Sequence, residues 1–106
     1  MSNKPYIDAA PSIINSPDGS VLFECIVQGN PQPEVKWYFK DQELSGERYL
    51  AKIKKAVGKF TATLRIKDPN QNDQGIYKVV ATNSNGSCER EQTYVLVCTA
   101  DAVYKE

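Results

Sequence analysis

The sequence predicts an all-β domain in which antiparallel strands form a sandwich or a barrel. Short segments of alternating apolar and polar residues recur along the chain, most clearly at residues 60–67, where Phe60, Ala62 and Leu64 alternate with polar neighbours. Turn-forming residues separate these segments at short, regular intervals. Because aromatic and β-branched residues dominate the segments, strands are favoured over helices.

The strands are expected wherever this alternation runs between two turns. Two short pieces at residues 5–7 and 12–15 are expected at a sheet edge, because prolines lie within or beside them. The other strands are expected at residues 21–27, 35–39, 43–44, 49–55 and 60–67, in the stretch 73–83 after a tight turn, and at 87–98. Turns are expected at Val57-Gly58 and, as a hairpin, at residues 83–86.

Length and composition indicate one soluble globular domain without a nucleic-acid or membrane partner. The chain has 106 residues, of which 41% are hydrophobic and 25% charged. Lysine plus arginine equals aspartate plus glutamate at 13 each, so no overall field favours a polyanion. No apolar run approaches the roughly 18 residues of a membrane span, and the N-terminus as it stands lacks the apolar core of a secretory signal.

Some apolar residues are expected to point away from the core. Alternation places Leu22 and Ile26 on the outer side of their strand, and Val95 and Val97 on that of the last strand. These residues could mark an interface, or the N-terminal segment could cover them. Of the two, coverage by the N-terminal segment is the expectation.

Three residues make the sandwich prediction specific. Cys25 is followed by Trp37, and Tyr77 closes an Asp73-x-Gly75-x-Tyr77 run. This pattern resembles immunoglobulin domains, in which a strand B cysteine packs against a strand C tryptophan and a tyrosine corner opens strand F. The sequence segments at residues 29–38, 41–44 and 81–86 resemble those of the intermediate (I-set) subclass. The resemblance is strongest to the I-set domains of intracellular muscle proteins such as titin, twitchin and projectin.

The resemblance implies an immunoglobulin-like β-sandwich of two antiparallel sheets with Greek-key connections. It covers residues 5–98, with an N-terminal tail at 1–4 and a C-terminal tail or linker at 99–106. The residues that it implies for the structural core are Phe23, Cys25, Trp37, Leu64, Asp73, Gly75, Tyr77 and Val79.

Val79 departs from the family pattern, which places the second core cysteine there. A bridge from Cys25 would close a loop of 55 residues, worth about 4 kcal/mol by loop entropy. Cys88 and Cys98 cannot pair with each other within one extended strand, since ten residues span about 33 Å and bridged Cα atoms lie about 4.4–6.8 Å apart. A domain without a disulfide suits a reducing cytoplasm. The formal glycosylation triplet Asn85-Gly86-Ser87 is weak evidence for secretion.

The residue types present argue against catalysis, metal and cofactors. The chain has no histidine, and its three cysteines do not fall at zinc-ligand spacings. Cys25 is interpreted as a small buried apolar group rather than a redox thiol. Asp73 and Tyr77 are interpreted as a turn and a buried phenol rather than an acid–base pair. The parent chain could still carry a kinase domain elsewhere, as some relatives of the resembled family do.

Charge is distributed unevenly along the chain. Between Lys36 and Lys67 there are nine basic and three acidic residues, a local net charge of +6. If neighbouring strands bring them together, five of these residues form a basic patch: Lys52, Lys54, Lys59, Arg65 and Lys67. The patch is either a solvated face of ordinary lysines or a docking surface for an acidic filament protein or an oppositely charged neighbouring domain.

The function implied is a non-catalytic structural and protein-interaction module of a sarcomeric scaffold in the cytoplasm. Such a module acts as a spacer, a mechanical element or a filament-docking domain, with protein partners and a monomeric domain. Its terminal strands, clasped by backbone hydrogen bonds, are expected to resist force. The alternative is an extracellular adhesion or receptor domain that lacks the core disulfide.

Overall fold

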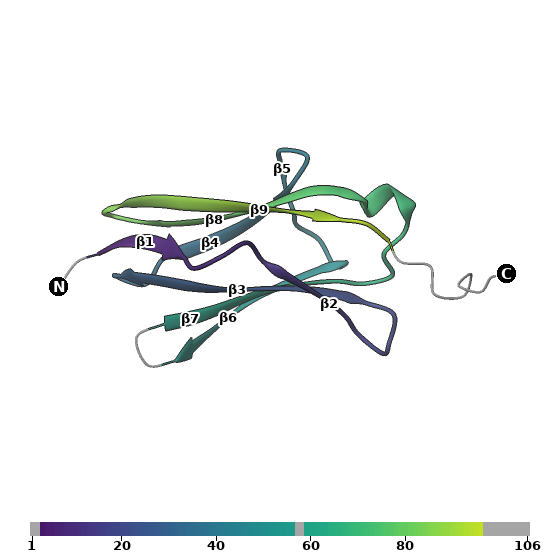
Figure 1. Ribbon diagram of the computed structural model, residues 1–106, viewed down its shortest axis with the longest axis horizontal. Coiled ribbons are helices and arrows are strands. Elements are labelled where there is room, and N and C mark those ends of the chain that lie inside the picture. Colours follow the sequence, from purple (N-terminus) through teal and green to yellow (C-terminus); the bar gives the residue numbers. More distant parts are fainter. Residues whose placement is uncertain (1–2, 57–58, 97–106) are drawn as a thin grey trace, which may run out of the picture.

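The computed structural model describes residues 3–56 and 59–96, which form two antiparallel sheets packed face to face (Figure 1). The five-stranded sheet contains β1 (Asn3–Ile7), β2 (Ser12–Asn15), β3 (Val21–Asn30), β6 (Tyr49–Ala56) and β7 (Lys59–Ile66). The four-stranded sheet contains β4 (Glu34–Phe39), β5 (Gln42–Glu43), β8 (Gly75–Asn83) and β9 (Gly86–Tyr94). The chain is therefore a sandwich and not a barrel.

The strand order is that of a Greek key. In the five-stranded sheet β3 lies between β7 and the two N-terminal strands, and β6 forms the far edge. In the four-stranded sheet the order is β5-β4-β8-β9. The connections β3–β4, β5–β6 and β7–β8 each cross from one sheet to the other, so residues distant in sequence share one core.

Alternation along β3 and β7 builds one wall of the core. Val21, Phe23, Cys25 and Val27 are buried, whereas the residues between them are partly exposed. In register with them on β7 lie the buried residues Ile66, Leu64, Ala62 and Phe60. The period of two that predicted both strands therefore separates core from surface, as sheet geometry requires.

Aromatic rings join the two walls. The Phe23 ring lies 4.7 Å from that of Tyr77 and 6.2 Å from that of Trp37, measured between centroids. Phe39 stacks on Tyr77 at 4.5 Å, and the buried Tyr94 packs edge-on to Phe23. Such rings bury large areas and fix the spacing of the sheets.

The N-terminal segment does not cover the outward-facing side chains of β3, contrary to the expectation from the sequence. β1 and β2 both pair with β3, with Tyr6 opposite Gln28 and Ile14 opposite Leu22, so the segment extends the sheet sideways instead of lying over its face. Leu22 and Ile26 stay partly exposed, and the expectation that they are covered is wrong. β1 begins at Asn3, inside the expected tail.

Two strand ends also differ from the expectation. β3 continues to Asn30 because β1 pairs with it there, with Asn3 opposite Asn30. β9 ends at Tyr94 and not at Cys98; Val95 is exposed, and Leu96 packs against the core outside the strand. The expected turn Val57-Gly58, Val97, Cys98 and the tail 99–106 lie outside the described residues.

Candidate protein-binding surface

The tyrosine corner has a structural role. The Tyr77 hydroxyl donates a hydrogen bond of 2.6 Å to the backbone carbonyl of Asp73, four residues earlier. Burial raises the pKa of the Tyr77 phenol, with a smaller contribution from the Asp73 charge. Gly75 lies between them with φ +144°, and a Cβ there would approach the Phe39 ring to 3.0 Å. The motif therefore fixes the entry into β8 and leaves no reactive phenol.

The buried Asp73 carboxylate is fully engaged. It receives a 2.7 Å hydrogen bond from Arg48 and a 2.8 Å hydrogen bond from the backbone amide of Asn70, which caps the 3₁₀ turn η1 (Gln71–Asp73). Arg48 also donates to the carbonyls of Lys67 and Asp68 at 3.1 and 3.2 Å. The hydrogen bond that Arg48 donates to the Asp73 carboxylate raises the pKa of the Arg48 guanidinium. This arrangement ties β6 to the β7–β8 connection and offers no acid–base pair.

Cys25 and Val79 occupy the two positions where the family pattern places the core disulfide. Both are buried; Val79 is paired with Trp37, and Cys25 is a free thiol. Burial raises the pKa of the Cys25 thiol to about 12. A thiol that stays protonated in an apolar core is inert, so Cys25 is a packing residue.

The structure brings four of the five patch residues to one surface, the outer face of the five-stranded sheet. Lys52 and Lys54 on β6 are opposite Thr63 and Thr61 on β7, and Lys59 and Arg65 belong to the same outward set on β7. Lys67 follows β7 and lines a depression of about 210 Å³ together with Arg65. The sequence therefore identified residues that lie together.

The patch is partly neutralised by acidic residues on the same side. Lys59 lies 4.0 Å from a carboxylate oxygen of Asp8, and Arg65 lies 3.6 Å from one of Asp18. Within the ranges 3–56 and 59–96, neither Lys52 nor Lys54 forms an ion pair within 4 Å. The patch charge without an ion pair among the described residues therefore lies on β6, the edge strand, and on Lys67 after β7.

Apolar side chains accompany this charge. A hollow of about 290 Å³ is lined by Leu22, Leu50, Lys52, Thr63 and Arg65. Leu50 is 43% exposed. The hollow was not anticipated from the sequence, because it depends on the register that places Leu22 and Leu50 on either side of Arg65.

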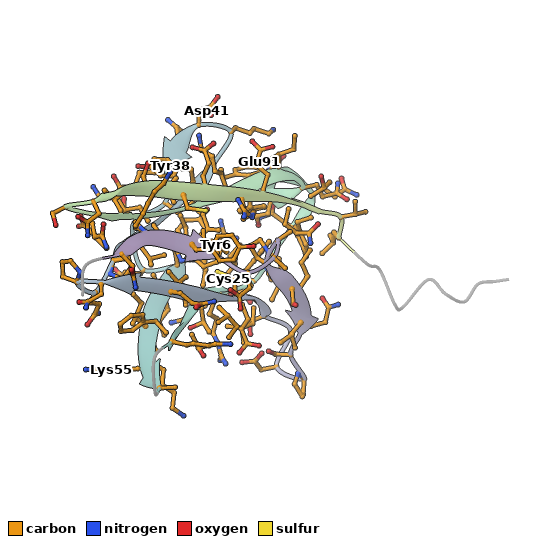
Figure 2. The ribbon with its side chains drawn as sticks, turned by 60° about the vertical axis from the view of Figure 1, so that its left-hand side comes forward. Tyr6, Cys25, Tyr38, Asp41, Lys55 and Glu91 are labelled. Carbon is orange, nitrogen blue, oxygen red and sulfur yellow. The ribbon has the colours of Figure 1, made fainter. Side chains whose placement is uncertain are left out.

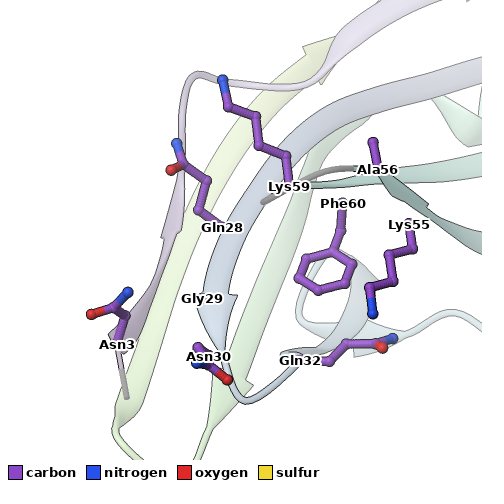
Figure 3. A pocket seen from close by; sticks show the side chains of 9 residues that line it. All are labelled: Asn3, Gln28, Gly29, Asn30, Gln32, Lys55, Ala56, Lys59 and Phe60. Atoms are coloured by element: carbon purple, nitrogen blue, oxygen red, sulfur yellow. The ribbon is translucent and has the colours of Figure 1, made fainter. Parts of the chain in front are cut away.

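A third depression lies at the end of the sandwich near the start of β1. Its volume is about 400 Å³, and polar amides together with Lys55 and Lys59 surround Phe60 at its base (Figure 3). Figure 2 shows Lys55 projecting from this region, while Tyr38, Asp41 and Glu91 lie on the opposite side of the molecule. Basic side chains therefore continue from the outer face of the five-stranded sheet to this end.

Two features with defined roles were missed in the sequence. One is Arg48, counted only as a basic residue. The other is a pair of asparagines in the β8–β9 turn: Asn83 donates to the carbonyls of Asn3 and Pro31 at 2.8 and 3.0 Å, and Asn85 donates to that of Asn30 at 3.0 Å. These contacts span more than 50 positions, so local patterns carry no signal for them.

The described part of the chain contains no cluster of three or more potential metal-ligating His, Cys, Asp or Glu residues. Among the same residues, no helix has the length and apolarity needed to cross a bilayer.

The two-sheet sandwich, the tyrosine corner and the Cys25–Trp37 pair define an immunoglobulin-type domain. A family model described as the immunoglobulin I-set domain matches residues 5–96. The chain belongs to the immunoglobulin I-set family.

Relatives of two kinds are similar to this chain. Roundabout homolog 2 of Homo sapiens is 39% identical over 74 residues, which cover 70% of this chain and 5% of that protein. M-protein of striated muscle from Gallus gallus is 37% identical over 82 residues, 76% of this chain and 5% of that protein. A solved titin M4 structure superposes with a TM-score of 0.71 at 30% identity, covering 88% of this chain and 95% of that one. The chain thus spans about one twentieth of these two curated relatives.

Proposed function

We infer that the chain is a non-catalytic structural and protein-interaction module of an intracellular muscle scaffold protein. The observation that carries this proposal is the core without a disulfide, in which Val79 is fully buried and Cys25 remains a thiol. A sandwich whose core positions 25 and 79 hold no disulfide suits a reducing compartment, where disulfides are rare. Similarity to M-protein and to titin M4 supports the same assignment.

Within such a scaffold the domain acts as a spacer and as a docking element for filament proteins or a neighbouring domain of opposite charge. The basic patch supports docking, because Lys52 and Lys54 are exposed on an edge strand and without ion pairs among the described residues. A surface of one sign attracts partners of the other and sets their orientation. The domain bounds 5–98, the monomeric state and the absence of a cofactor remain predictions.

The second candidate is an extracellular adhesion or receptor domain. Similarity to Roundabout homolog 2 favours it, as does the formal triplet Asn85-Gly86-Ser87. However, the Asn85 side-chain nitrogen already donates to the carbonyl of Asn30, and a glycan on that nitrogen would compete with this contact. A signal peptide or membrane span in the full-length parent would decide for this candidate.

Cosedimentation with isolated thick and thin filaments tests docking. The wild-type domain is expected to pellet with one filament type, and the triple variant Lys52→Glu, Lys54→Glu, Lys59→Glu is expected to stay in solution. Lys36→Glu, on the outer side of β4, is the matched control for charge reversal elsewhere. Binding that survives the triple variant, or no binding by the wild type, would end the docking proposal.

A further inference from the structure

An apolar row crosses the outer face of the five-stranded sheet. Ile14 is opposite Leu22, Leu22 is opposite Arg65, and Arg65 is opposite Leu50. Directly opposite residues lie about 4.5–5.5 Å apart at Cβ, so these four side chains form a continuous line across β2, β3, β7 and β6. The line contains three aliphatic groups and one guanidinium.

The hollow of about 290 Å³ lies in this row, between Leu22 and Leu50. The rest of its lining is Lys52, Thr63 and Arg65, so two positive charges and no carboxylate border it. An apolar side chain fits between the leucines, and a carboxylate beside that side chain would meet Lys52 or Arg65. The hollow thus combines an apolar contact with charge recognition.

The acidic residues of this face lie toward the other edge. Asp8 is next to Lys59 and Asp18 is next to Arg65, while Glu24 on β3 is between Ser12 and Thr63 in the register. A flat polyanion, such as an anionic bilayer or a nucleic-acid backbone, would meet these three carboxylates as well as the lysines. A short segment can place its negative charges over β6 and β7 alone.

We propose that this face binds an acidic segment of a partner protein, which inserts one apolar side chain between Leu22 and Leu50 and sets its carboxylates against Lys52 and Arg65. The inference rests on the proposed docking function and names the chemistry of the partner. Arg65 keeps donors for a second carboxylate because a guanidinium carries five N–H groups.

Three fluorescently labelled peptides test the proposal with the whole chain by fluorescence anisotropy. The first has a leucine flanked on each side by two glutamates, the second replaces the leucine with serine, and the third replaces the glutamates with lysines. The first peptide is expected to bind, the second to bind about tenfold more weakly because it lacks the apolar anchor, and the third not to bind. High salt is expected to weaken the first interaction.

Two variants and two matched controls locate the site. Leu50→Ser and Lys52→Glu are each expected to weaken binding of the first peptide about tenfold. Ile76→Ser and Lys36→Glu make corresponding changes at exposed residues on the outer side of the four-stranded sheet and are expected to leave binding of the first peptide unchanged. Thermal unfolding of each variant checks that it is folded.

Several outcomes overturn the inference: no binding of the first peptide, equal loss in the controls, or binding of phosphatidylserine vesicles in place of the peptide. Filament cosedimentation separates this inference from the proposed function. Filaments that bind Leu50→Ser as well as wild type would contradict the acidic-segment site and leave docking intact. If the domain binds the first peptide but neither filament type, filament docking is contradicted and the acidic-segment site is not.

Discussion

Arg48 shows how one side chain can organise a connection. Its guanidinium reaches the Asp73 carboxylate and two backbone carbonyls in the segment that leads from β7 to η1. The Asp73 side chain is only 6% exposed, whereas that of Arg48 is 41% exposed. Removing the cation would leave a buried carboxylate with a single amide donor, which is costly because a buried charge needs compensation.

Arg48→Met is therefore expected to lower the free energy of unfolding by about 2–3 kcal/mol. Urea unfolding followed by the fluorescence of Trp37, the single tryptophan, measures the change. Arg65→Met is the matched control, since its carboxylate partner Asp18 is exposed and 3.6 Å away; a much smaller loss is expected there. Equal losses in the two variants would show that the Arg48–Asp73 pair has no special role.

The Cys25 thiol predicts how stability changes at alkaline pH. Burial raises its pKa from 9.0 to about 12 in the folded domain, so between these values the unfolded chain releases a proton that the folded chain retains. The protonated Cys25 thiol therefore makes its full contribution to the free energy of unfolding below about pH 9. That contribution is lost as pH rises toward 12, by at most about 1.4 kcal/mol per pH unit. Burial shifts the pKa of the Tyr77 phenol in the same direction.

Urea midpoints measured between about pH 8 and pH 11 test this prediction. The midpoint of the wild type is expected to fall with pH, and Cys25→Ala is expected to show a shallower fall. Cys88→Ala, which changes a partly exposed thiol, is the control and should follow the wild type. A Cys25→Ala profile parallel to that of the wild type would contradict the assignment of the alkaline stability loss to the Cys25 thiol.

Among the elements, the β8–β9 turn does more than reverse the chain. Asn83 holds the carbonyls of Asn3 and Pro31 with one amide group, and its own carbonyl accepts from the backbone of Asn85. The turn thereby fastens the first residue of β1 and the β3–β4 loop to the four-stranded sheet. Since β1 pairs only with β3 in the described sheets, this asparagine contact links β1 to the other sheet.

Asn83→Ala is expected to lower the free energy of unfolding by about 1 kcal/mol, because the Pro31 carbonyl loses its side-chain donor and the Asn3 carbonyl keeps only the 3.4 Å contact from Asn85. It is also expected to speed amide hydrogen exchange in β1 more than in β7, as measured by mass spectrometry. Ser84→Ala, in the same turn, is the control. Uniform exchange changes in both strands would argue for global destabilisation instead of a local clamp.

The sequence predicts elements better than the contacts between them. Strong alternation located β3 and β7, and the Asp73–Tyr77 run predicted the corner that the hydrogen bond confirms. The end of β9 was misplaced because Val95 and Leu96 continue an apolar run after pairing with β8 has ended. The Leu22–Leu50 hollow depends on the register of three strands, and Arg48–Asp73 joins residues 25 positions apart, so neither has a local signature.

At the scale of the molecule, the terminal strands belong to different sheets. β1 pairs with β3 and β9 with β8, and β1 begins at the end of the sandwich opposite to that where β9 ends (Figure 1). Backbone hydrogen bonds therefore hold each terminal strand to a neighbour within its own sheet. Force applied between the two ends of the domain loads both pairs along the strands, so several backbone hydrogen bonds must break together.

Single-molecule pulling is expected to show one cooperative unfolding step when the domain is held at its two ends. Pulling between the N-terminus and a handle at Ser84 is the geometric control, because Asn83 contacts Asn3 and both points lie at one end. That direction peels β1 away a few bonds at a time and is expected to need less force. Unfolding at negligible force in both directions would remove the mechanical role.

We propose above that this I-set domain, which has a free thiol at Cys25 and valine at position 79, works inside muscle cells. An antibody raised against the domain tests it most directly, applied to intact and to permeabilised muscle fibres with surface biotinylation in parallel. The proposed function predicts striated staining only after permeabilisation and no surface label on the parent protein. Staining of intact fibres, together with a biotinylated parent, would contradict it and favour the adhesion or receptor alternative.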